Sequence, residues 1–378
     1  MEKDHPSRPP AGWFFRGHPQ ARVRFQPYSF HSRVPIITLY SLHSMPIFQH
    51  LAIDLGTTYS VVWIMSTDSF VQEPTFVAFK RRNRQPLAIG GEAKRMFGFT
   101  PNHIQVIQPL REGVISDFEV CSIFLQTLIK KILSKRKGIV RNVLFCLPWG
   151  ATDVEIRAYR KQLELYPFSR IYLVREPLAA ALGAEIPIEN PDGNILVDLG
   201  GGTTEITTLA INGIVHCNSL KTGGNSMDQT IQHEIELKKQ FCIGLTTAEA
   251  IKINHGTIAP VIEDYSFDIK GFNRRTLLPR RTSLETAEIR DCLEPIVQKI
   301  LQGIITAFES LTPELAADIS TNGITLVGGG AYLRGWPERI KDRFNLPVHI
   351  PPQPHLCVIK GMQKILKKLK TYRFLLEE

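Results

Sequence analysis

Two short motifs of the chain combine a carboxylate, glycine and threonine in the same order: DLGTT at residues 54–58 and DLGGGTT at residues 198–204. Glycine allows consecutive backbone N–H groups to approach a phosphate oxygen, because no Cβ obstructs the approach or restricts φ. The threonine hydroxyls add further donors. Asp54 and Asp198 directly precede the two turns, where a carboxylate can hold the waters of a Mg²⁺ ion that bridges phosphates. The motifs therefore predict two phosphate-binding turns beside a magnesium site.

A third glycine motif lies in ITLVGGGAYLRG at residues 324–335, where an apolar run leads into three glycines before a helix start. Such a stretch suits a phosphate or a flat ring lying against the backbone. A single DLGT motif is more often an ordinary hairpin, but two copies with a third glycine motif favour a nucleotide site. Glu249 and Lys252 share one helical face and could bind ribose hydroxyls, although such a pair alone is more often a surface ion pair.

Each of the first two motifs is positioned by the same pattern of elements. Residues 49–64 and 195–211 both read as an apolar strand, a tight turn and a second β-branched strand, and the second copy turns again at Asn212-Gly213. Between the copies lie another strand at 141–148 and the helical stretch TDVEIRAYRKQLELY. The repetition predicts two related half-molecules, and the alternation predicts mixed α/β layers.

Composition limits the class of protein. The chain has 378 residues, of which 43% are apolar, so it can bury a large core and we expect two domains. The formal net charge of the chain is +9. Residues 1–44 hold five Arg and one Lys against two acids, so the net charge of the remaining residues is close to that of an ordinary protein. Six cysteines without a C-x-x-C pair disfavour a zinc site and a disulfide framework, and indicate a reducing cytoplasm. No apolar run is long enough to span a membrane, so we expect a soluble or peripheral protein.

Residues 1–44 mix six prolines with Arg and His and show no lasting periodicity. We expect this extension to be disordered. Met45 follows directly, and MPIFQHLAIDLG reads as a natural beginning of a folded domain. Met1 and Met45 are therefore both candidate translation starts.

The order of the motifs resembles the actin-like ATPase superfamily, and in detail it resembles the MreB family of bacterial rod-shape proteins. The stretches that carry the resemblance span residues 90–120, 175–205, 245–253 and 311–335, and the likeness extends from about His50 to about Leu366. It implies an α/β actin-like ATPase fold with two duplicated ribonuclease H-like subdomains, each on a five-stranded sheet, with smaller inserted subdomains and a central nucleotide cleft. The first large subdomain is implied to span residues 45–73 and 109–188, and the C-terminal residues 350–378 return to it. Its inserted small subdomain is 74–108. The second large subdomain is implied to span 189–223 and 286–349, with residues 224–285 as its inserted small subdomain.

The resemblance also assigns roles to residues. Glu176, in REPLAAA, stands where the family places the carboxylate that positions the attacking water, with Thr203 as its helper. Without the family, Glu176 would read as a helix-entry acid beside Pro177. Asp54 and Asp198 correspond to the magnesium-site carboxylates. The residues expected to bind ATP are Gly56, Thr57, Thr58, Tyr59, Gly200, Gly201, Gly202, Thr203, Thr204, Glu249, Lys252, Gly328, Gly329, Gly330, Ala331 and Tyr332.

The chain departs from the family at two places. The first turn reads DLGTTYS, which is closer to the seventy-kilodalton heat-shock chaperones, although only 43 residues follow Gly335 and a substrate-binding domain would need more. Asn225-Ser226 replace two acids that the family normally has near the nucleotide, which could weaken its binding. A chaperone-like ATPase and a sugar kinase of the same superfamily are the alternative functions, and no sequence feature marks a pocket for a second substrate.

The function implied by the resemblance is that of an ATP-dependent, membrane-associated filament protein that organises cell-wall synthesis and maintains cell shape. ATP and Mg²⁺ are the implied cofactors, with slow ATP hydrolysis coupled to polymerisation. The implied partners are further copies of the chain, the inner face of the cytoplasmic membrane, a RodZ-like adaptor and wall enzymes, with no nucleic acid. For membrane contact we expect Ile139 and Val140, flanked by the basic residues Lys135, Arg136, Lys137 and Arg141. The basic segment at 364–374 is the rival anchor.

Overall fold

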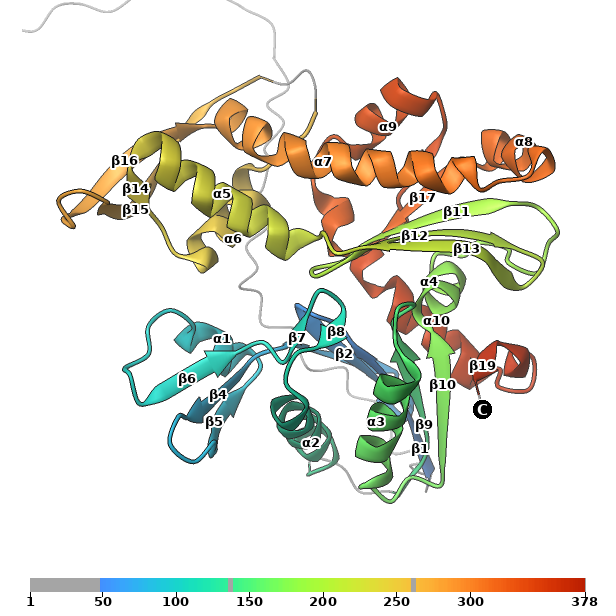
Figure 1. Cartoon of the computed structure of the whole chain (residues 1–378). Coiled ribbons are helices and arrows are strands. Elements are labelled where there is room, and N and C mark those ends of the chain that lie inside the picture. Colours follow the sequence, from blue (N-terminus) through green and yellow to red (C-terminus); the bar gives the residue numbers. More distant parts are fainter. Residues whose placement is uncertain (1–47, 135–138, 260–262, 378) are drawn as a thin grey trace, which may run out of the picture. The chain divides into compact units, whose positions relative to one another are not determined.

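The computed structural model describes residues 48–134, 139–259 and 263–377 (Figure 1). The extension expected to be disordered, residues 1–44, therefore lies outside the described residues, as do Lys135, Arg136 and Lys137. Within the described ranges, none of the helices combines the length and the apolar character needed to cross a membrane.

The first large sheet carries the DLGTT motif at the end of a central strand. Its order is β19-β10-β9-β1-β2-β3, with β1 antiparallel to β2 and parallel to β9. One strand more is present than the five expected, because the two-residue β19 pairs antiparallel with the edge strand β10. The bounds are β1 Phe48–Leu55, β2 Tyr59–Ile64, β3 Ser69–Pro74, β9 Ile139–Leu147, β10 Arg170–Arg175 and β19 Leu376–Glu377.

The second large sheet repeats this arrangement around the DLGGGTT motif. Its order is β13-β12-β11-β17-β18, with β11 antiparallel to β12 and parallel to β17. The turn after β12 is formed by Ile211 and Asn212, both at positive φ, one residue earlier than the sequence suggested. The bounds are β11 Asn194–Leu199, β12 Thr204–Ala210, β13 Gly213–Leu220, β17 Ile324–Val327 and β18 Val348–His349.

Helices cover both large sheets, and two of these helices pack against residues of both sheets at once. The buried side chains of α2 (Phe118–Ser134) and α3 (Asp153–Glu164) pack on one face of the first sheet. Helices α4 (Glu176–Gly183) and α10 (Cys357–Lys367) form a separate cluster that takes residues from both large sheets. Helix α7 (Thr286–Glu309) runs along the other face of the second sheet (Figure 1). Two further helices, α8 Pro313–Asn322 and α9 Trp336–Phe344, complete this layer.

Two smaller sheets fall within the ranges predicted for the inserted subdomains. The sheet β5-β4-β6 packs on α1, and the sheet β14-β15-β16 packs on α5. A two-stranded hairpin, β7 and β8, follows the first of them. The bounds are β4 Val77–Lys80, β5 Pro86–Ile89, α1 Gly91–Met96, β6 Ile104–Ile107, β7 Leu110–Arg111, β8 Val114–Ile115, α5 Gly224–Lys239, β14 Phe241–Cys242, α6 Leu245–His255, β15 Ser266–Asn273 and β16 Pro279–Glu285.

The structure contradicts the expected membrane contact at Val140. This residue is the second of strand β9, is 5% exposed and packs in the core beneath α2, so it cannot enter a bilayer. Ile139 begins the same strand and pairs with Phe48. A basic run followed by two β-branched residues is equally typical of a strand that starts at the surface and continues into the core.

The rival anchor is also largely committed to the fold. The apolar face of α10, with Met362, Ile365 and Leu366, is buried in the core shared by the two sheets. Lys364 donates to the Leu182 carbonyl and Lys367 pairs with Asp68 at 3.0 Å. The helical part of the 364–374 segment therefore does not have a free apolar face.

Two glycines allow α4 and α10 to meet backbone to backbone. A Cβ at Gly361 would overlap the Ala179 carbonyl of α4, and a Cβ at Gly183 would overlap the Cys357 carbonyl of α10. Since the atoms in the way belong to the backbone, they cannot move aside as a flexible side chain would.

We expect Gly361→Ala to lower the free energy of unfolding by about 1–3 kcal/mol, because the added methyl group must separate the two helices. Gly150→Ala is the matched control, since nothing lies within 4 Å of a Cβ at that position. Thermal unfolding followed by circular dichroism measures both. Equal melting temperatures for the two variants would show that the α4–α10 contact tolerates a side chain.

Candidate functional site

The structure brings the turns of the two DLG motifs into direct contact, although about 140 residues separate them in the sequence. A Cβ at Gly201 would overlap the Thr58 hydroxyl, and a Cβ at Gly202 would lie 2.6 Å from the Thr57 hydroxyl. Gly113 closes the site from a third segment, because its N–H donates to Thr57 Oγ1 at 3.2 Å. The two turns predicted separately therefore form one site, at which glycine is needed for the close approach.

The N-terminus of α5 meets the second turn. The N–H of Gly224 donates to the Gly200 carbonyl at 3.0 Å, and the N–H of Asn225 donates to the Gly201 carbonyl at 2.8 Å. A Cβ at Gly223 would lie 2.7 Å from the Gly200 carbonyl oxygen. These glycines were not predicted as site residues, although the KTGG sequence before a helix was the available signal. A helix N-terminus beside a glycine turn favours an anion.

The third glycine motif lies against the end of β11. Gly328 has a φ of +81°, and a Cβ there would overlap a carboxylate oxygen of Asp198. A Cβ at Gly330 would lie 2.8 Å from Leu199 Cβ, whereas nothing lies within 4 Å of a Cβ at Gly329. Gly329 is therefore the open position of this motif, where a flat group could lie against the backbone.

Four carboxylates converge behind the turns. Burial raises the pKa of Asp198 to about 6, and burial together with the charge of Asp198 raises the pKa of Asp54 to about 7. Burial, followed by the charges of Glu205, Asp198 and Asp54, raises the pKa of Glu176 well above its usual value. In a site of low dielectric like charges repel, so a cation bound there would favour the ionised form of these carboxylates.

Glu205 was not predicted as a site residue. It lies on β12, and burial followed by the charge of Asp198 raises its pKa to about 8. One of its oxygens, Oε2, is buried without a hydrogen-bond partner, although the Trp149 backbone and the Ser219 side chain donate to the carboxylate. The signal was a single acid within TTEITTLA, a run in which every residue of the strand is buried.

The residues present fit a hydrated Mg²⁺ ion. Such an ion is typically held by one or two carboxylates and completes its shell with waters and phosphate oxygens. Asp54 lies near the end of β1 and Asp198 near the end of β11, each just before a glycine turn. The unpartnered oxygen of Glu205 can accept a hydrogen bond from a water molecule. Among the described residues, no group of three or more His, Cys, Asp or Glu forms a metal site by itself.

Comparison with known proteins identifies the family of the chain. The family model described as MreB/Mbl protein matches residues 48–373. The chain belongs to the MreB/Mbl family. The cell shape-determining protein MreB of Escherichia coli strain K12 is 35% identical over 329 residues, which cover 85% of this chain and 94% of that protein. The cell shape-determining protein Mbl of Bacillus subtilis strain 168 is 35% identical over 319 residues, which cover 84% of this chain and 96% of that protein.

A solved structure of the same family superposes closely. The crystal structure of MreB 5 of Spiroplasma citri bound to AMPPNP has a TM-score of 0.81 and 31% identity, and the match covers 86% of this chain and 98% of that chain. The MreB/Mbl membership and the actin-like α/β fold expected from the sequence are thereby confirmed. The nucleotide contacts of individual residues in this member of the family stay predictions.

Several predicted nucleotide ligands are held by protein partners. Glu249 forms an ion pair with Lys94 of α1 at 2.7 Å, and the Lys94 ammonium also lies 5.2 Å from the centre of the Tyr59 ring. Lys252 pairs with Asp228 at 2.7 Å and donates to the Gly224 carbonyl at 2.8 Å. The expected face of α6 thus borders the site, and a hollow of about 80 Å³ lies beside it with Thr58, Lys94, Asn225 and Glu249 in its wall.

Three predicted ligands use their side chains elsewhere. The Thr204 side chain is fully buried and donates to the Thr222 carbonyl at 2.7 Å, so its expected role as a phosphate donor is wrong for the hydroxyl. The Ala331 side chain packs in the core of the second half. The Tyr332 hydroxyl is hydrogen-bonded to His355 Nδ1 at 2.8 Å.

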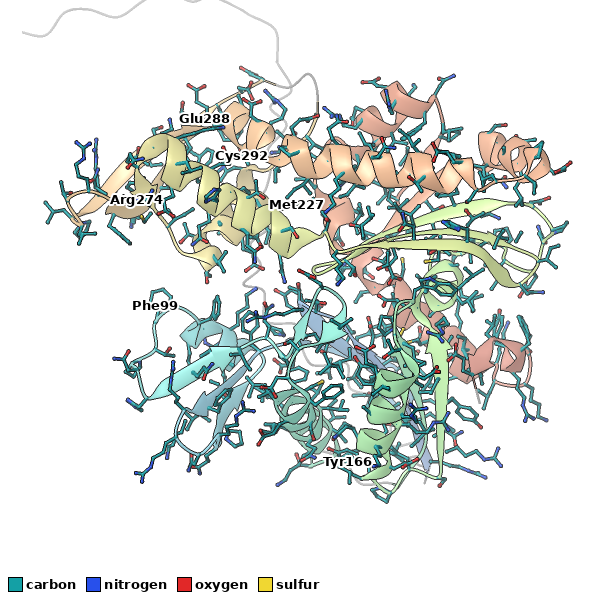
Figure 2. All side chains as sticks on the ribbon, viewed as in Figure 1. Phe99, Tyr166, Met227, Arg274, Glu288 and Cys292 are labelled. Carbon is teal, nitrogen blue, oxygen red and sulfur yellow. The ribbon has the colours of Figure 1, made fainter. Side chains whose placement is uncertain are left out.

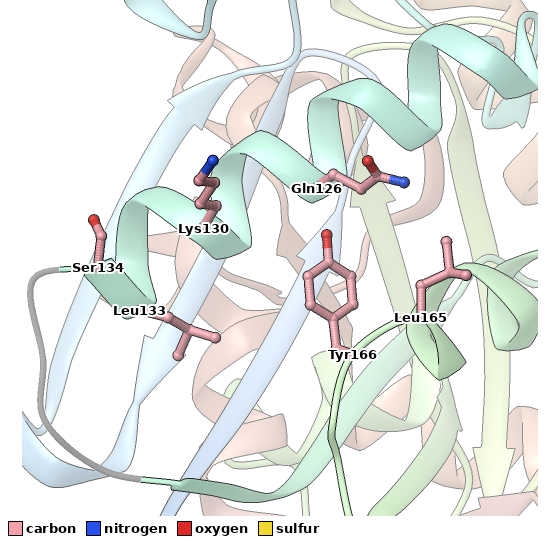
Figure 3. Close-up of a pocket in the computed structure, with 6 residues that line it drawn as sticks. All are labelled: Gln126, Lys130, Leu133, Ser134, Leu165 and Tyr166. Carbon is pink, nitrogen blue, oxygen red and sulfur yellow. The ribbon is translucent and has the colours of Figure 1, made fainter.

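A larger hollow of about 600 Å³ lies away from the glycine turns, between α2 and residues 165–166 (Figure 3). The Tyr166 side chain extends into this hollow with its hydroxyl directed towards α2. This hydroxyl is buried without a hydrogen-bond partner. Gln126, Lys130, Leu133, Ser134 and Leu165 complete the lining. None of the glycine motifs contributes to it.

The carboxylate cluster predicts a pH dependence for the nucleotide-free protein. Because the folded pKa values of Asp54 and Glu205, about 7 and about 8, lie above the unfolded values near 4, their contribution to stability is complete below pH 4 and is lost as the pH rises through the folded values. We therefore expect the melting temperature in EDTA to fall between pH 6.5 and about 8.5. This window avoids His50, His255 and His355, whose pKa values burial lowers.

Glu205→Gln is expected to reduce this fall, because the amide does not titrate. Glu309→Gln, which replaces an exposed acid at the end of α7, serves as the control and should leave the slope as it is in the unmodified chain. A melting temperature that rises over the same window in the unmodified protein would contradict the assignment of raised pKa values to these buried carboxyl groups.

Proposed function

We propose that this chain is an ATP-dependent filament protein that lies on the inner face of the cytoplasmic membrane and maintains cell shape by organising cell-wall synthesis. The observation that carries the proposal is the contact between the two DLG turns, with Gly201 against Thr58 and Gly202 against Thr57. Because each turn belongs to a different half of the chain, a nucleotide bound there couples the positions of both halves.

The phosphates are proposed to lie between the two turns and the N-terminus of α5. Backbone N–H groups of residues 56–58 and 200–203 supply donors that carry no charge and need little rearrangement. Asp54 and Asp198 would hold a Mg²⁺ ion, which would supply positive charge beside the phosphate oxygens. The nucleotide bound to the related MreB 5 of Spiroplasma citri supports this placement, since the two chains share their fold.

Glu176 is proposed to position the attacking water for hydrolysis. It is the first residue of α4, and burial, followed by the charges of the neighbouring carboxylates, raises its pKa well above the usual value. In its ionised form such a carboxylate can accept a proton from water while the phosphoryl group is transferred, and its position matters more than its strength as a base. Thr203, at the turn that faces Gly113, helps to orient the water.

Assembly follows from a nucleotide-fixed orientation of the halves. When each copy holds the same orientation, a head-to-tail contact repeats without closing and produces a filament. The same resemblance supports a RodZ-like adaptor and the wall enzymes as partners. Cell shape-determining relatives from Escherichia coli and Bacillus subtilis support the cellular role. Electron microscopy of the protein with ATP on anionic liposomes tests the proposal, and a soluble kinase or chaperone would give no filaments.

We expect Asp198→Asn to abolish ATP-dependent sedimentation while it leaves the melting temperature of the nucleotide-free protein equal or higher. The amide removes a charge that the Mg²⁺ ion needs, and it also relieves repulsion with Asp54. Asp192→Asn, an exposed position shortly before β11, is the control. If the Asp198 variant pellets with ATP as the unmodified protein does, Asp198 is not the magnesium ligand.

Glu176→Gln is expected to slow phosphate release by about 10²-fold or more and to leave ATP-dependent sedimentation intact, because the water is no longer positioned but the nucleotide still binds. Phosphate release and pelleting are measured on the same sample. Loss of both together would place Glu176 in nucleotide binding instead of hydrolysis.

A further inference from the structure

An exposed hairpin in the second half carries an unusual combination of side chains. Strands β15 and β16 are joined by residues 274–278, and the stretch NRRTLLPRR at residues 273–281 forms its tip, here called the arginine hairpin. Figure 1 shows the hairpin projecting beyond α5 and α6, and Figure 2 shows Arg274 near its end. Every residue from 274 to 281 is exposed.

The tip is ordered by hydrogen bonds of its own. The Asn273 side-chain oxygen accepts from the N–H groups of Arg275 and Thr276 at 3.0 and 2.9 Å. The Asn273 carbonyl accepts from the Leu277 N–H at 2.8 Å, and the Asn273 N–H donates to the Leu278 carbonyl at 3.0 Å. These hydrogen bonds hold the tip in one backbone conformation, so the tip is a defined turn.

Two features of this turn oppose folding. Leu277 has a φ of +56°, in the left-handed region that favours glycine or asparagine, yet its side chain is 71% exposed. Leu278 beside it is 64% exposed. A leucine in a strained conformation that buries little of its surface does not stabilise the chain, and such strain gathers at positions kept for function.

The charges on the hairpin also oppose folding. Lys270 and Arg281 are directly opposite one another across the two strands, and like charges in this position repel. Arg274 pairs with Glu236 at 3.2 Å. Arg275, Arg280 and Arg281 form no ion pair within the described part of the chain, so their charge is available to a partner.

We propose that the arginine hairpin binds an anionic lipid surface, with Leu277 and Leu278 entering the acyl boundary and Arg275, Arg280 and Arg281 bound to lipid phosphates. This inference rests on the membrane association in the proposed function and names the element that provides it. Two apolar side chains at the end of a projecting turn, with cations around them, match a surface that is apolar inside and negative at its rim. Guanidinium groups suit phosphate because they donate two parallel hydrogen bonds.

The buried state of the earlier candidates supports this choice. Val140 lies in the core, and the apolar face of α10 packs between the two large sheets. The arginine hairpin instead offers its leucines and three of its arginines to solvent. One hairpin gives weak binding, and a filament with many copies binds tightly because each contact raises the effective concentration of the next.

The test is flotation of ATP-assembled protein with vesicles of phosphatidylglycerol and phosphatidylcholine, compared with phosphatidylcholine alone. We expect the unmodified protein to float only with the anionic vesicles, and Leu277→Asn/Leu278→Ser to reduce the bound fraction at least tenfold. Asparagine tolerates the left-handed conformation, so the turn is retained. Arg280→Gln/Arg281→Gln is expected to weaken binding and to flatten its dependence on salt.

Leu237→Asn is the matched control, since Leu237 is a 49% exposed leucine on α5 of the same half and should float as the unmodified protein does. Sedimentation with ATP in the absence of lipid must be unchanged in every variant. If the unmodified protein does not bind anionic vesicles, the proposed membrane association fails. If it binds but the leucine variant binds equally, or if that variant no longer assembles without lipid, the hairpin is not the membrane contact and the inference is overturned.

Discussion

The contact between α4 and α10 is the constraint on which the rest of the molecule depends. Gly183 and Gly361 let the two backbones meet, and the core that these helices share contains residues from both large sheets. Strands β1 and β11 end beside this core, so its geometry fixes where Asp54 and Asp198 stand. A looser contact would separate the two DLG turns, because each is attached to a different sheet.

This rigid arrangement holds four acids where they repel each other. Burial raises the pKa of Asp54, Asp198, Glu205 and Glu176, and the charge of at least one neighbouring carboxylate raises it further for all except Asp198. Such a cluster lowers the stability of the protein without its ligand, because buried carboxylates are unfavourable. A bound cation with a phosphate chain would reduce this cost, which is typical of a functional site. The direct contact of the glycine turns has the same meaning, because the backbone is placed in advance for a ligand and does not need to reorganise.

The sequence was sufficient to predict the parts of the site that depend on local chemistry. A carboxylate before a glycine turn on a strand repeats at Asp54 and Asp198, and both strands, both turns and the convergence on a third glycine motif are present in the structure. The Lys94–Glu249 ion pair could not be predicted in this way, because it joins segments far apart in the chain. The expectation for Val140 is wrong because a basic run followed by β-branched residues also describes the start of a buried strand.

Strand β19 is linked to the start of α4, the helix that carries Glu176. Glu377 of β19 forms an ion pair with Arg175, the residue that precedes Glu176, and β19 itself pairs with the edge of β10. A fluorescent protein or an affinity tag fused directly to this strand would pull on the start of α4. The loop between α1 and β6, where nothing lies within 4 Å of a Cβ at Gly98, gives an internal label more room. The position of a label thus affects whether imaging in cells reports on the native filament or on a perturbed one.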